Sequence, residues 1–394
     1  MTAAGGDGWI RVALVHGPGG PDRDGVSDYV QRLRHALGEV GVAAVSVPVR
    51  PVRGRWLAGT AQAARTIRRI RPQVIHVQFA PAAYRFSGAP GLLPLLLPGD
   101  VPLVTTLHEY GGWSWPARLP AGAWRPLERA GLWCRETGRL VPASAELVVT
   151  NADHADGLVT RTGRRPVRVP LAPNVDDHGG AEQARRRWRR RFRLGPHAEL
   201  LLFFGFVHPV KGVRYLLEAL AALRTQRPDI RLLVVGGFTS QALPEAQARM
   251  FRAELDRDAH RLGVADAVWF TGHLPAREVS AALHAADLVV LPFTAGVTTK
   301  SGALLAALAH GRPVAVTVAD PPDPQLRADE TVAVIPIRRD ASAIAGTVRR
   351  LLDDAALRNR LSANGRRFAE RHSWPRVAVA HRDLYLRLLG RGDD

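Results

Sequence analysis

Residues 200–206 read LLLFFGF, and a similar short apolar run, IRVALVH, stands at residues 10–16. Each run is followed by a glycine-containing loop and then by a segment in which apolar residues recur at steps of three and four. In the first half this spacing places one helical face over Val26, Val30, Leu33, Leu37 and Val40. The order of strand, loop and amphipathic helix predicts a parallel α/β sheet that starts twice along the chain.

Further short apolar runs alternate with helical patterns in both halves of the chain. They stand at residues 74–78, 103–108, 147–151, 231–235, 268–271, 288–292 and 314–317. A stretch rich in Gly, Pro and Arg, residues 170–196, predicts a linker between the halves. We therefore predict two Rossmann-like, doubly wound domains over residues 1–185 and 186–373, with a C-terminal helix in residues 374–394 that packs back on the first domain.

Length and composition exclude several classes of protein. A chain of 394 residues with 46% hydrophobic and 23% charged residues is long enough for two globular cores, and too long for one small binding module. The single cysteine, Cys134, excludes an internal disulfide and a cysteine-rich zinc site, and it favours a reducing compartment. Residues 1–9 lack the pattern of a secretion signal and no apolar run reaches about 20 residues, so we expect a cytoplasmic protein.

The formal net charge of +18 does not by itself indicate a nucleic-acid partner. The arginines are spread along the whole chain, so we expect no nucleic acid to be bound. The densest run, residues 185–193, leaves two interpretations open, a solvated helix face and peripheral contact with an anionic membrane surface.

Only two of the 54 basic residues are lysines, Lys211 and Lys300. Each stands in a loop that follows a predicted strand and precedes a predicted helix. Ligands of open α/β sheets bind at the carboxyl ends of the strands, where helix N-termini present free N–H groups. A lysine ammonium is compact where a guanidinium is a planar fork, so these two loops predict a site for a phosphate-bearing ligand.

A third loop of this kind follows residues 10–16 and carries Gly19, Gly20 and Gly25. Its spacing matches neither a dinucleotide fingerprint nor a Walker loop, so a purely structural turn is an equal alternative.

The ordered motifs resemble those of family 4 glycosyltransferases over nearly the whole chain. In the first half the resemblance rests on VIHVQ (74–78), TTLHEY (105–110), VVTNADHADGL (148–158) and PLAPNVD (170–176). In the second half it rests on FGFVHPVKGVRYLLEAL (204–220), LLVVGG (232–237) and ALLAALAHGRPVAVT (303–317). The resemblance implies a retaining enzyme of the GT-B fold, with two facing Rossmann-like domains. The first would bind the acceptor and the second a nucleoside diphosphate sugar, without a cofactor or metal.

The same resemblance assigns roles to individual residues. It implies that Lys211 binds the donor diphosphate and that the Ser301 and Gly302 backbone holds its terminal phosphate, with His108 beside the donor sugar. Lys300 is the second candidate cation, so our candidate catalytic residues are His108, Lys211 and Lys300. The candidate substrate-binding residues are Gly19, Gly20, Gly25, Glu109, Gly205, Gly272, His273, Leu274, Thr298, Thr299, Ser301 and Gly302.

Three positions depart from the family pattern. Phe206 stands where an arginine is usual, and Thr298 and Ala306 stand where the family has two glutamates eight positions apart. Lys300 or a nearby arginine could replace the missing cation. A catalytically degenerate partner protein of the same fold is therefore an alternative. A nucleotide-sugar epimerase is another, although Thr298 and Ala306 supply none of the acids that it needs.

Other residues complete the predicted site. Trp113, Trp115, Trp124 and Trp133 offer aromatic faces for an acceptor, with packing against the core as an equal alternative. The acid pairs in residues 22–24 and 256–258 are interpreted as solvated, and His76 as a core residue.

The resemblance therefore implies a retaining hexosyltransferase that uses the donor phosphate as base in a front-face mechanism. UDP- and GDP-sugars are the commonest donors of the family. The acceptor would be a hydroxyl of a small molecule, a glycan or a lipid-linked sugar, and the protein a monomer or homodimer.

Overall fold

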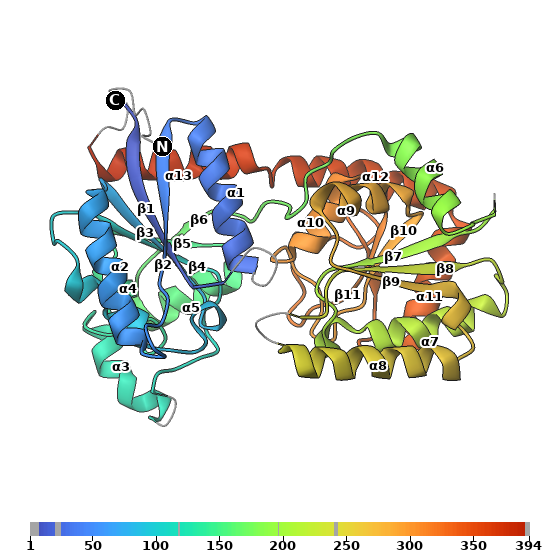
Figure 1. Cartoon of the computed structure of the whole chain (residues 1–394), viewed down its shortest axis with the longest axis horizontal. Helices are drawn as coiled ribbons and strands as arrows, with labels where there is room; N and C mark the ends of the chain where they lie inside the picture. Colours follow the sequence, from blue (N-terminus) through green and yellow to red (C-terminus); the bar gives the residue numbers. More distant parts are fainter. Residues whose placement is uncertain (1–7, 20–24, 117–118, 196, 240–242, 391–394) are drawn as a thin grey trace. The chain divides into compact units, whose positions relative to one another are not determined.

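The computed structural model describes residues 8–19, 25–116, 119–195, 197–239 and 243–390 (Figure 1). The chain forms two compact units, the first made of Met1–Pro170 with Trp374–Asp394 and the second of Leu171–Ser373. Each unit contains one six-stranded sheet. In the described part of the chain, no helix combines the length and the apolar character that crossing a membrane requires.

The first sheet has the strand order β2-β1-β3-β4-β5-β6, and all its pairings are parallel. Its strands are β1 (Ile10–His16), β2 (Val42–Pro48), β3 (Val74–Phe79), β4 (Leu103–Leu107), β5 (Glu146–Val149) and β6 (Val167–Arg168). Its helices are α1 (Gly25–Glu39), α2 (Trp56–Ile70), η1 (Ala82–Tyr84), η2 (Ala89–Leu96), α3 (Ala121–Arg129), α4 (Leu140–Ala143) and α5 (Ala152–Thr162). The central strands β3 and β4 are buried at every position, as expected for strands covered on both faces.

The second sheet repeats this architecture with the order β12-β11-β10-β7-β8-β9, again all parallel. Its strands are β7 (Leu200–Phe204), β8 (Arg231–Val235), β9 (Val268–Gly272), β10 (Leu288–Leu291), β11 (Val314–Thr317) and β12 (Ala333–Ile335). Its helices are α6 (Ala181–Arg191), η3 (Pro209–Lys211), α7 (Val213–Arg224), α8 (Glu245–Arg261), η4 (Ala265–Ala267), α9 (Ala276–Ala285), α10 (Gly302–Ala309), α11 (Ala341–Asp353) and α12 (Ala355–Glu370). The fully buried run of β7 confirms the strand predicted from residues 200–206.

The last helix, α13 (Trp374–Leu388), belongs to the first unit, as predicted. The hydroxyl of Tyr385 lies 2.6 Å from Nδ1 of His76 in β3, and Nε2 of the same ring lies 2.7 Å from Oγ1 of Thr106 in β4. Tyr385 and His76 have no exposed surface. The pair therefore fixes α13 to the sheet through a fully satisfied buried imidazole, which confirms His76 as a core residue.

The unit boundary lies at Pro170, before the residue 185 predicted from the sequence. The difference comes from α6, which packs on α9 through Ala184 and Trp188. Trp188 is 1% exposed and stacks on Phe192, whose ring lies 4.5 Å from that of Trp269. The arginine-rich segment is thus an amphipathic helix of the second unit and not a linker.

Replacing Tyr385 by Phe tests how α13 is held. The substitution removes the hydroxyl and leaves Nδ1 of the buried His76 without its partner, so we expect a loss of about 1–3 kcal/mol in the free energy of unfolding. Urea unfolding followed by circular dichroism measures it. Arg387→Ala, in the last turn of the same helix, is the control and should change the midpoint little. Equal midpoints for Tyr385→Phe and wild type would contradict this role.

Candidate active site

Three glycines bring backbones close together at the carboxyl edge of the second sheet. Gly205, Gly236 and Gly272 end or follow β7, β8 and β9, and all three have positive φ. A Cβ on Gly236 would lie 2.0 Å from the carbonyl oxygen of Gly205, and the Gly236 N–H donates to the Gly272 carbonyl at 3.1 Å. Only glycine fits these contacts without strain. Gly205 and Gly272 were predicted; Gly236 was missed as a site residue, although it lies in the quoted LLVVGG motif.

Lys211 ends the short helix η3 that follows β7. Its ammonium lies 3.7 Å above the centroid of the Phe293 ring, a cation–π contact. Burial lowers the pKa of Lys211 to about 8. Among the described residues, no carboxylate forms an ion pair with it. Lys211 is thus a half-buried cation whose charge faces an aromatic ring and no acid.

The loop of Lys211 is joined to the loop that follows β10. The Thr294 amide and hydroxyl both donate to the Val210 carbonyl, at 2.9 and 3.1 Å. Gly212 has a φ of +72° and packs against the Pro292 carbonyl. A Cβ at this position would lie 2.0 Å from the carbonyl oxygen. The two lysine-bearing loops predicted from the sequence therefore begin side by side at one sheet edge.

The second of these loops leads into α10 through residues 298–302. Ser301 caps the helix, because its hydroxyl accepts a hydrogen bond from the Leu304 N–H at 3.2 Å. Thr299 donates from its amide and its hydroxyl to one carboxylate oxygen of Asp323, both at 2.8 Å. The Lys300 amide donates to the Thr298 hydroxyl at 3.4 Å. The segment is thus held in one conformation in front of the helix N-terminus, with Asp323 as a support that the sequence analysis missed.

Asn174 also lies at this helix N-terminus. A Cβ on Gly302 would stand 3.1 Å from the Asn174 side chain, and Oδ1 of Asn174 is buried without a hydrogen-bond partner in the described structure. The residue belongs to the motif PLAPNVD, which was used for the resemblance but not as a site. Its buried free acceptor makes it a further candidate for ligand contact.

The three residues that depart from the family pattern are buried or half-buried. Ala306 has no exposed surface, Thr298 is half-buried and Phe206 is half-buried after Gly205. None of the three can supply the charge that the family residue would carry. His273 and Leu274 continue the loop after Gly272, where His273 packs 3.7 Å from the position of a Cβ on Gly237.

In the first unit, His108 directly follows β4. Its Nε2 lies 2.8 Å from Oε1 of Gln78, and its ring makes an edge contact with Tyr29 at 4.8 Å between centroids. Burial lowers the pKa of His108 to about 3, with smaller effects from His154 and His381. The imidazole is therefore neutral near pH 7, and Gln78, a residue that the sequence analysis did not single out, fixes its orientation.

The exposed Glu109 starts a loop that a buried ion pair holds in place. The Gly111 N–H donates to both carboxylate oxygens of Glu136 at 3.0 Å, and the Arg161 guanidinium bonds both Glu136 and the Gly111 carbonyl. Glu136 and Arg161 lie 25 residues apart, so no local pattern reveals them.

The glycine-rich loop after β1 is described only in part. Gly19 lies in the described loop and Gly25 begins α1, whereas Gly20 lies outside the described residues. The glycine of this loop that packs closely against another backbone segment is Gly17. A Cβ there would lie 2.1 Å from the Ala83 carbonyl oxygen.

The four tryptophans differ in burial. Trp124 is 8% exposed and Trp113 packs against the core of the first unit, while Trp115 is 38% exposed and lies against Gly88. Trp133 is half-buried.

The acid pair Asp256 and Asp258 lies on α8. The two side chains form surface ion pairs with Arg252 and Arg261, respectively, as expected for solvated acids. The other pair, in residues 22–24, lies outside the described part of the chain.

One group with metal-ligating side chains was missed because its members are distant in sequence. Asp177, His284 and His310 offer ligand atoms within 4.8 Å of one another. Each is already engaged: Nε2 of His284 lies 2.7 Å from Asp177, and Nε2 of His310 lies 2.9 Å from Ser280, which also accepts from the His178 amide. These bonds fasten residues 177–178 to α9.

Comparison with known proteins decides the family. The model for Glycosyltransferase Family 4 matches residues 10–178, and the model for glycosyl transferases group 1 matches residues 184–368. The glycogen synthase of Mycobacterium tuberculosis H37Rv is 30% identical over 331 residues, covering 82% of this chain and 70% of that protein. The chain belongs to glycosyltransferase family 4. A relative named D-inositol 3-phosphate glycosyltransferase, from Salinispora tropica, is 28% identical over 95% of this chain and 83% of its own length.

Solved structures show the fold of this family 4 glycosyltransferase. The sucrose-phosphate synthase of Thermosynechococcus elongatus matches with a TM-score of 0.70 at 19% identity, over 97% of this chain and 99% of that one. The Anabaena protein HepE, solved with UDP and glucose, matches with a TM-score of 0.69 at 14% identity, over 95% and 99%. The predicted GT-B fold is thereby confirmed.

The scarcity of lysine in this glycosyltransferase allows a direct test of the Lys211 environment. Reductive ¹³C-methylation labels Lys211, Lys300 and the N-terminal amine, and a Lys211→Arg variant assigns the signals. We expect the Lys211 resonance to titrate near pH 8, because burial disfavours the charged form, instead of near the ordinary lysine value of about 10.4. Phe293→Leu, which removes the ring, is the companion variant. A Lys211 midpoint above 10 would show that the ammonium is solvated.

Proposed function

We propose that this glycosyltransferase retains anomeric configuration and moves a hexosyl group from a nucleoside diphosphate sugar to a hydroxyl acceptor. The observation that carries the proposal is the half-buried Lys211 ammonium, which has no carboxylate partner among the described residues and stands at the carboxyl edge of the second sheet. A desolvated cation of this kind is stabilised by an anion. A diphosphate leaving group supplies that anion when the donor binds.

The neighbouring groups fit the same ligand. The capped N-terminus of α10 presents the N–H groups of residues 302 and 303, which have no acceptor in the described structure, and helix N-termini stabilise phosphate through such groups and the helix dipole. We assign the donor diphosphate to Lys211, Lys300 and this helix terminus. Because these groups can meet its charge, we propose that transfer needs no metal, so chelation by EDTA should leave turnover unchanged.

The identity of donor and acceptor is inferred from relatives. HepE was solved with UDP and glucose, which supports a UDP-sugar donor here, with a GDP-sugar as the second choice. The names of the relatives include an inositol phosphate glycosyltransferase and a glycogen synthase. Both names denote transfer to a hydroxyl, so the acceptor class is a hydroxyl of a small molecule, a glycan or a lipid-linked sugar.

Proton transfer in this scheme uses the substrate. As the sugar–phosphate bond breaks, the departing phosphate oxygen takes the proton of the acceptor hydroxyl, and that hydroxyl oxygen bonds to the anomeric carbon on the same face. His108, neutral and oriented by Gln78, does not act as the base, because its pKa lies near 3. We assign to His108 the role of positioning the donor sugar.

Removing either lysine tests the donor site. Lys211→Met and Lys300→Met should each weaken UDP or GDP binding by about 10- to 100-fold, the cost of one charge-assisted hydrogen bond. Isothermal titration calorimetry measures the affinity. Arg214→Met, which removes an exposed cation of α7 paired with Glu254, is the matched control and should bind normally. Unchanged affinity in both lysine variants would defeat the donor assignment.

Turnover by the purified chain separates the proposed enzyme from a degenerate partner protein. Incubation with UDP- and GDP-sugars and a panel of alcohol acceptors should yield product whose anomeric configuration, read by NMR, equals that of the donor. Inversion would contradict the mechanism, and an isomerised donor would indicate an epimerase. Binding of donor without any turnover would favour the degenerate partner that the missing glutamates suggest.

His108→Ala should lower kcat by about 10- to 100-fold while leaving donor affinity within two-fold, because it removes a positioning contact and not the diphosphate site. Since His108 is neutral above its pKa, the wild-type rate should show no step from this residue between pH 5 and 8. His108→Gln, which keeps a hydrogen-bonding side chain, should recover part of the loss. A rate step in this range that His108→Gln abolishes would contradict a neutral His108.

A further inference from the structure

A second polar cavity lies at the opposite edge of the second sheet. Its volume is about 330 Å³, at the lower end of the size range of ligand pockets, about 300 to 1,000 Å³. Its lining includes residues just before three strands: Glu199 directly before β7, Asp287 directly before β10 and Arg312 two residues before β11. The predicted donor loops follow the carboxyl ends of β7 and β10, so the two sites are separated by the length of the strands.

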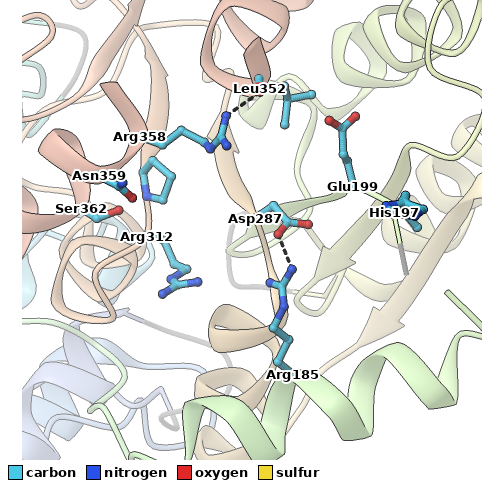
Figure 2. Close-up of a pocket in the computed structure, with 11 residues that line it drawn as sticks. Arg185, His197, Glu199, Asp287, Arg312, Leu352, Arg358, Asn359 and Ser362 are labelled. Atoms are coloured by element: carbon cyan, nitrogen blue, oxygen red, sulfur yellow. Dashed lines mark hydrogen bonds and ion pairs between the residues drawn. The ribbon is translucent and has the colours of Figure 1, made fainter. Parts of the chain in front are cut away.

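Arginines from three different elements surround this cavity (Figure 2). Arg185 comes from α6, Arg312 from the turn before β11 and Arg358 from the first turn of α12. Asn359 and Ser362, on the same helix as Arg358, add an amide and a hydroxyl to the wall. The lining therefore combines guanidinium groups with neutral hydrogen-bonding groups, the composition that recognises phosphate.

The two acids of the lining are already neutralised. Asp287 accepts from Arg185 at 2.6 Å and from the Leu200 amide at 2.8 Å, and Glu199 pairs with Arg227 outside the lining. Both acids thus have their ion-pair partners elsewhere, and Asp287 acts on Arg312 only as a charge without a hydrogen bond.

Arg312 and Arg358 bond to main-chain carbonyls instead of carboxylates. Arg312 donates to the carbonyls of His310 at 3.2 Å and Ala286 at 3.0 Å, and Arg358 donates to those of Leu351 and Leu352 at 2.5 Å. In the described structure neither forms an ion pair with a carboxylate. Burial, together with the charges of Arg366 and Arg185, lowers the pKa of Arg312, and the charges of Asp287 and Asp177 offset this only in part. The carbonyls orient both guanidinium groups but leave a local excess of positive charge.

We propose that this cavity binds a small phosphate-bearing anion, held by Arg312 and Arg358 with Asn359 and Ser362, at a site separate from the donor. The anion supplies the charge that these two arginines lack and accepts hydrogen bonds from the amide and the hydroxyl. The cavity has room for a free phosphate or pyrophosphate ion and for a phosphorylated monosaccharide. All these ligands share the phosphate group.

Calorimetric titration of the whole chain with inorganic phosphate, pyrophosphate and a hexose 6-phosphate tests the proposal. We expect at least one probe to bind, with affinity lowered at least ten-fold in Arg358→Gln. Arg367→Gln, which removes an exposed arginine of the same helix outside the lining, is the matched control and should bind like wild type. Tighter binding of the hexose phosphate identifies a phosphorylated metabolite, and equal affinities identify the free ion.

Two further variants keep the test decisive. The double variant Asn359→Ala/Ser362→Ala removes neutral groups of the wall and should weaken binding even if Arg358→Gln folds poorly. Lys211→Met disables the proposed donor site and should leave phosphate binding intact. Loss of phosphate binding in Lys211→Met with retention in Arg358→Gln would place the anion at the donor loops and overturn the proposal. So would the absence of binding to wild type by every probe, or equal weakening in Arg358→Gln and Arg367→Gln.

Discussion

The donor site proposed for the second unit depends on Lys211, a cation that no acid among the described residues neutralises. Lys211 rests on the face of Phe293, and the same loop contact that brings Phe293 there joins the segments after β7 and β10. An aromatic face attracts an ammonium but does not neutralise it. Burial therefore leaves Lys211 with a lowered pKa and an unmet need for an anion. A carboxylate at this place would stabilise the unliganded protein and would compete with a phosphate.

Three glycines with positive φ allow the loops around Lys211 to pack together. Gly205, Gly212 and Gly236 all have positive φ and lie against neighbouring backbone, so the strand ends and the lysine loop are packed without side chains between them. Backbone N–H groups near a sheet edge can approach a ligand only where no Cβ intervenes. The same three positions that allow the loops to pack together therefore suit the phosphate site proposed for this edge.

The sequence predicts most of the fold because the central strands are buried on both faces. Runs such as residues 200–206 and 74–78 are continuous and apolar, and they are β7 and β3. The sequence analysis did not predict β2, an edge strand in which Val45 and Ser46 are exposed. It also placed the boundary between the units later than Pro170. In α6 the pair Ala184 and Trp188, four residues apart, was hidden among arginines, although that spacing marks the buried face of a helix.

The site was predictable only where chemistry is local in sequence. A rare lysine between a strand and a helix can be recognised, and so can a serine cap before an apolar helix. The residues that support them cannot be recognised in this way. The partners lie 24 to 30 residues apart in sequence in the hydrogen-bonded pairs Thr299–Asp323, His108–Gln78 and Gly111–Glu136. Such pairs are created by the order of strands in the sheet, which no spacing rule encodes.

The two anion sites proposed here lie at opposite edges of the second sheet and differ in their cations. At the carboxyl edge the proposed cations are the ammonium groups of Lys211 and Lys300, together with backbone N–H groups, a set that can stabilise the charge that develops on a departing diphosphate. At the amino edge the cations are guanidinium groups fixed by carbonyls, as in the case of Arg312, which suit an anion of constant charge and fixed geometry. Lysine at one edge and arginine at the other would therefore suit a reacting ligand at the first proposed site and a resident ligand at the second.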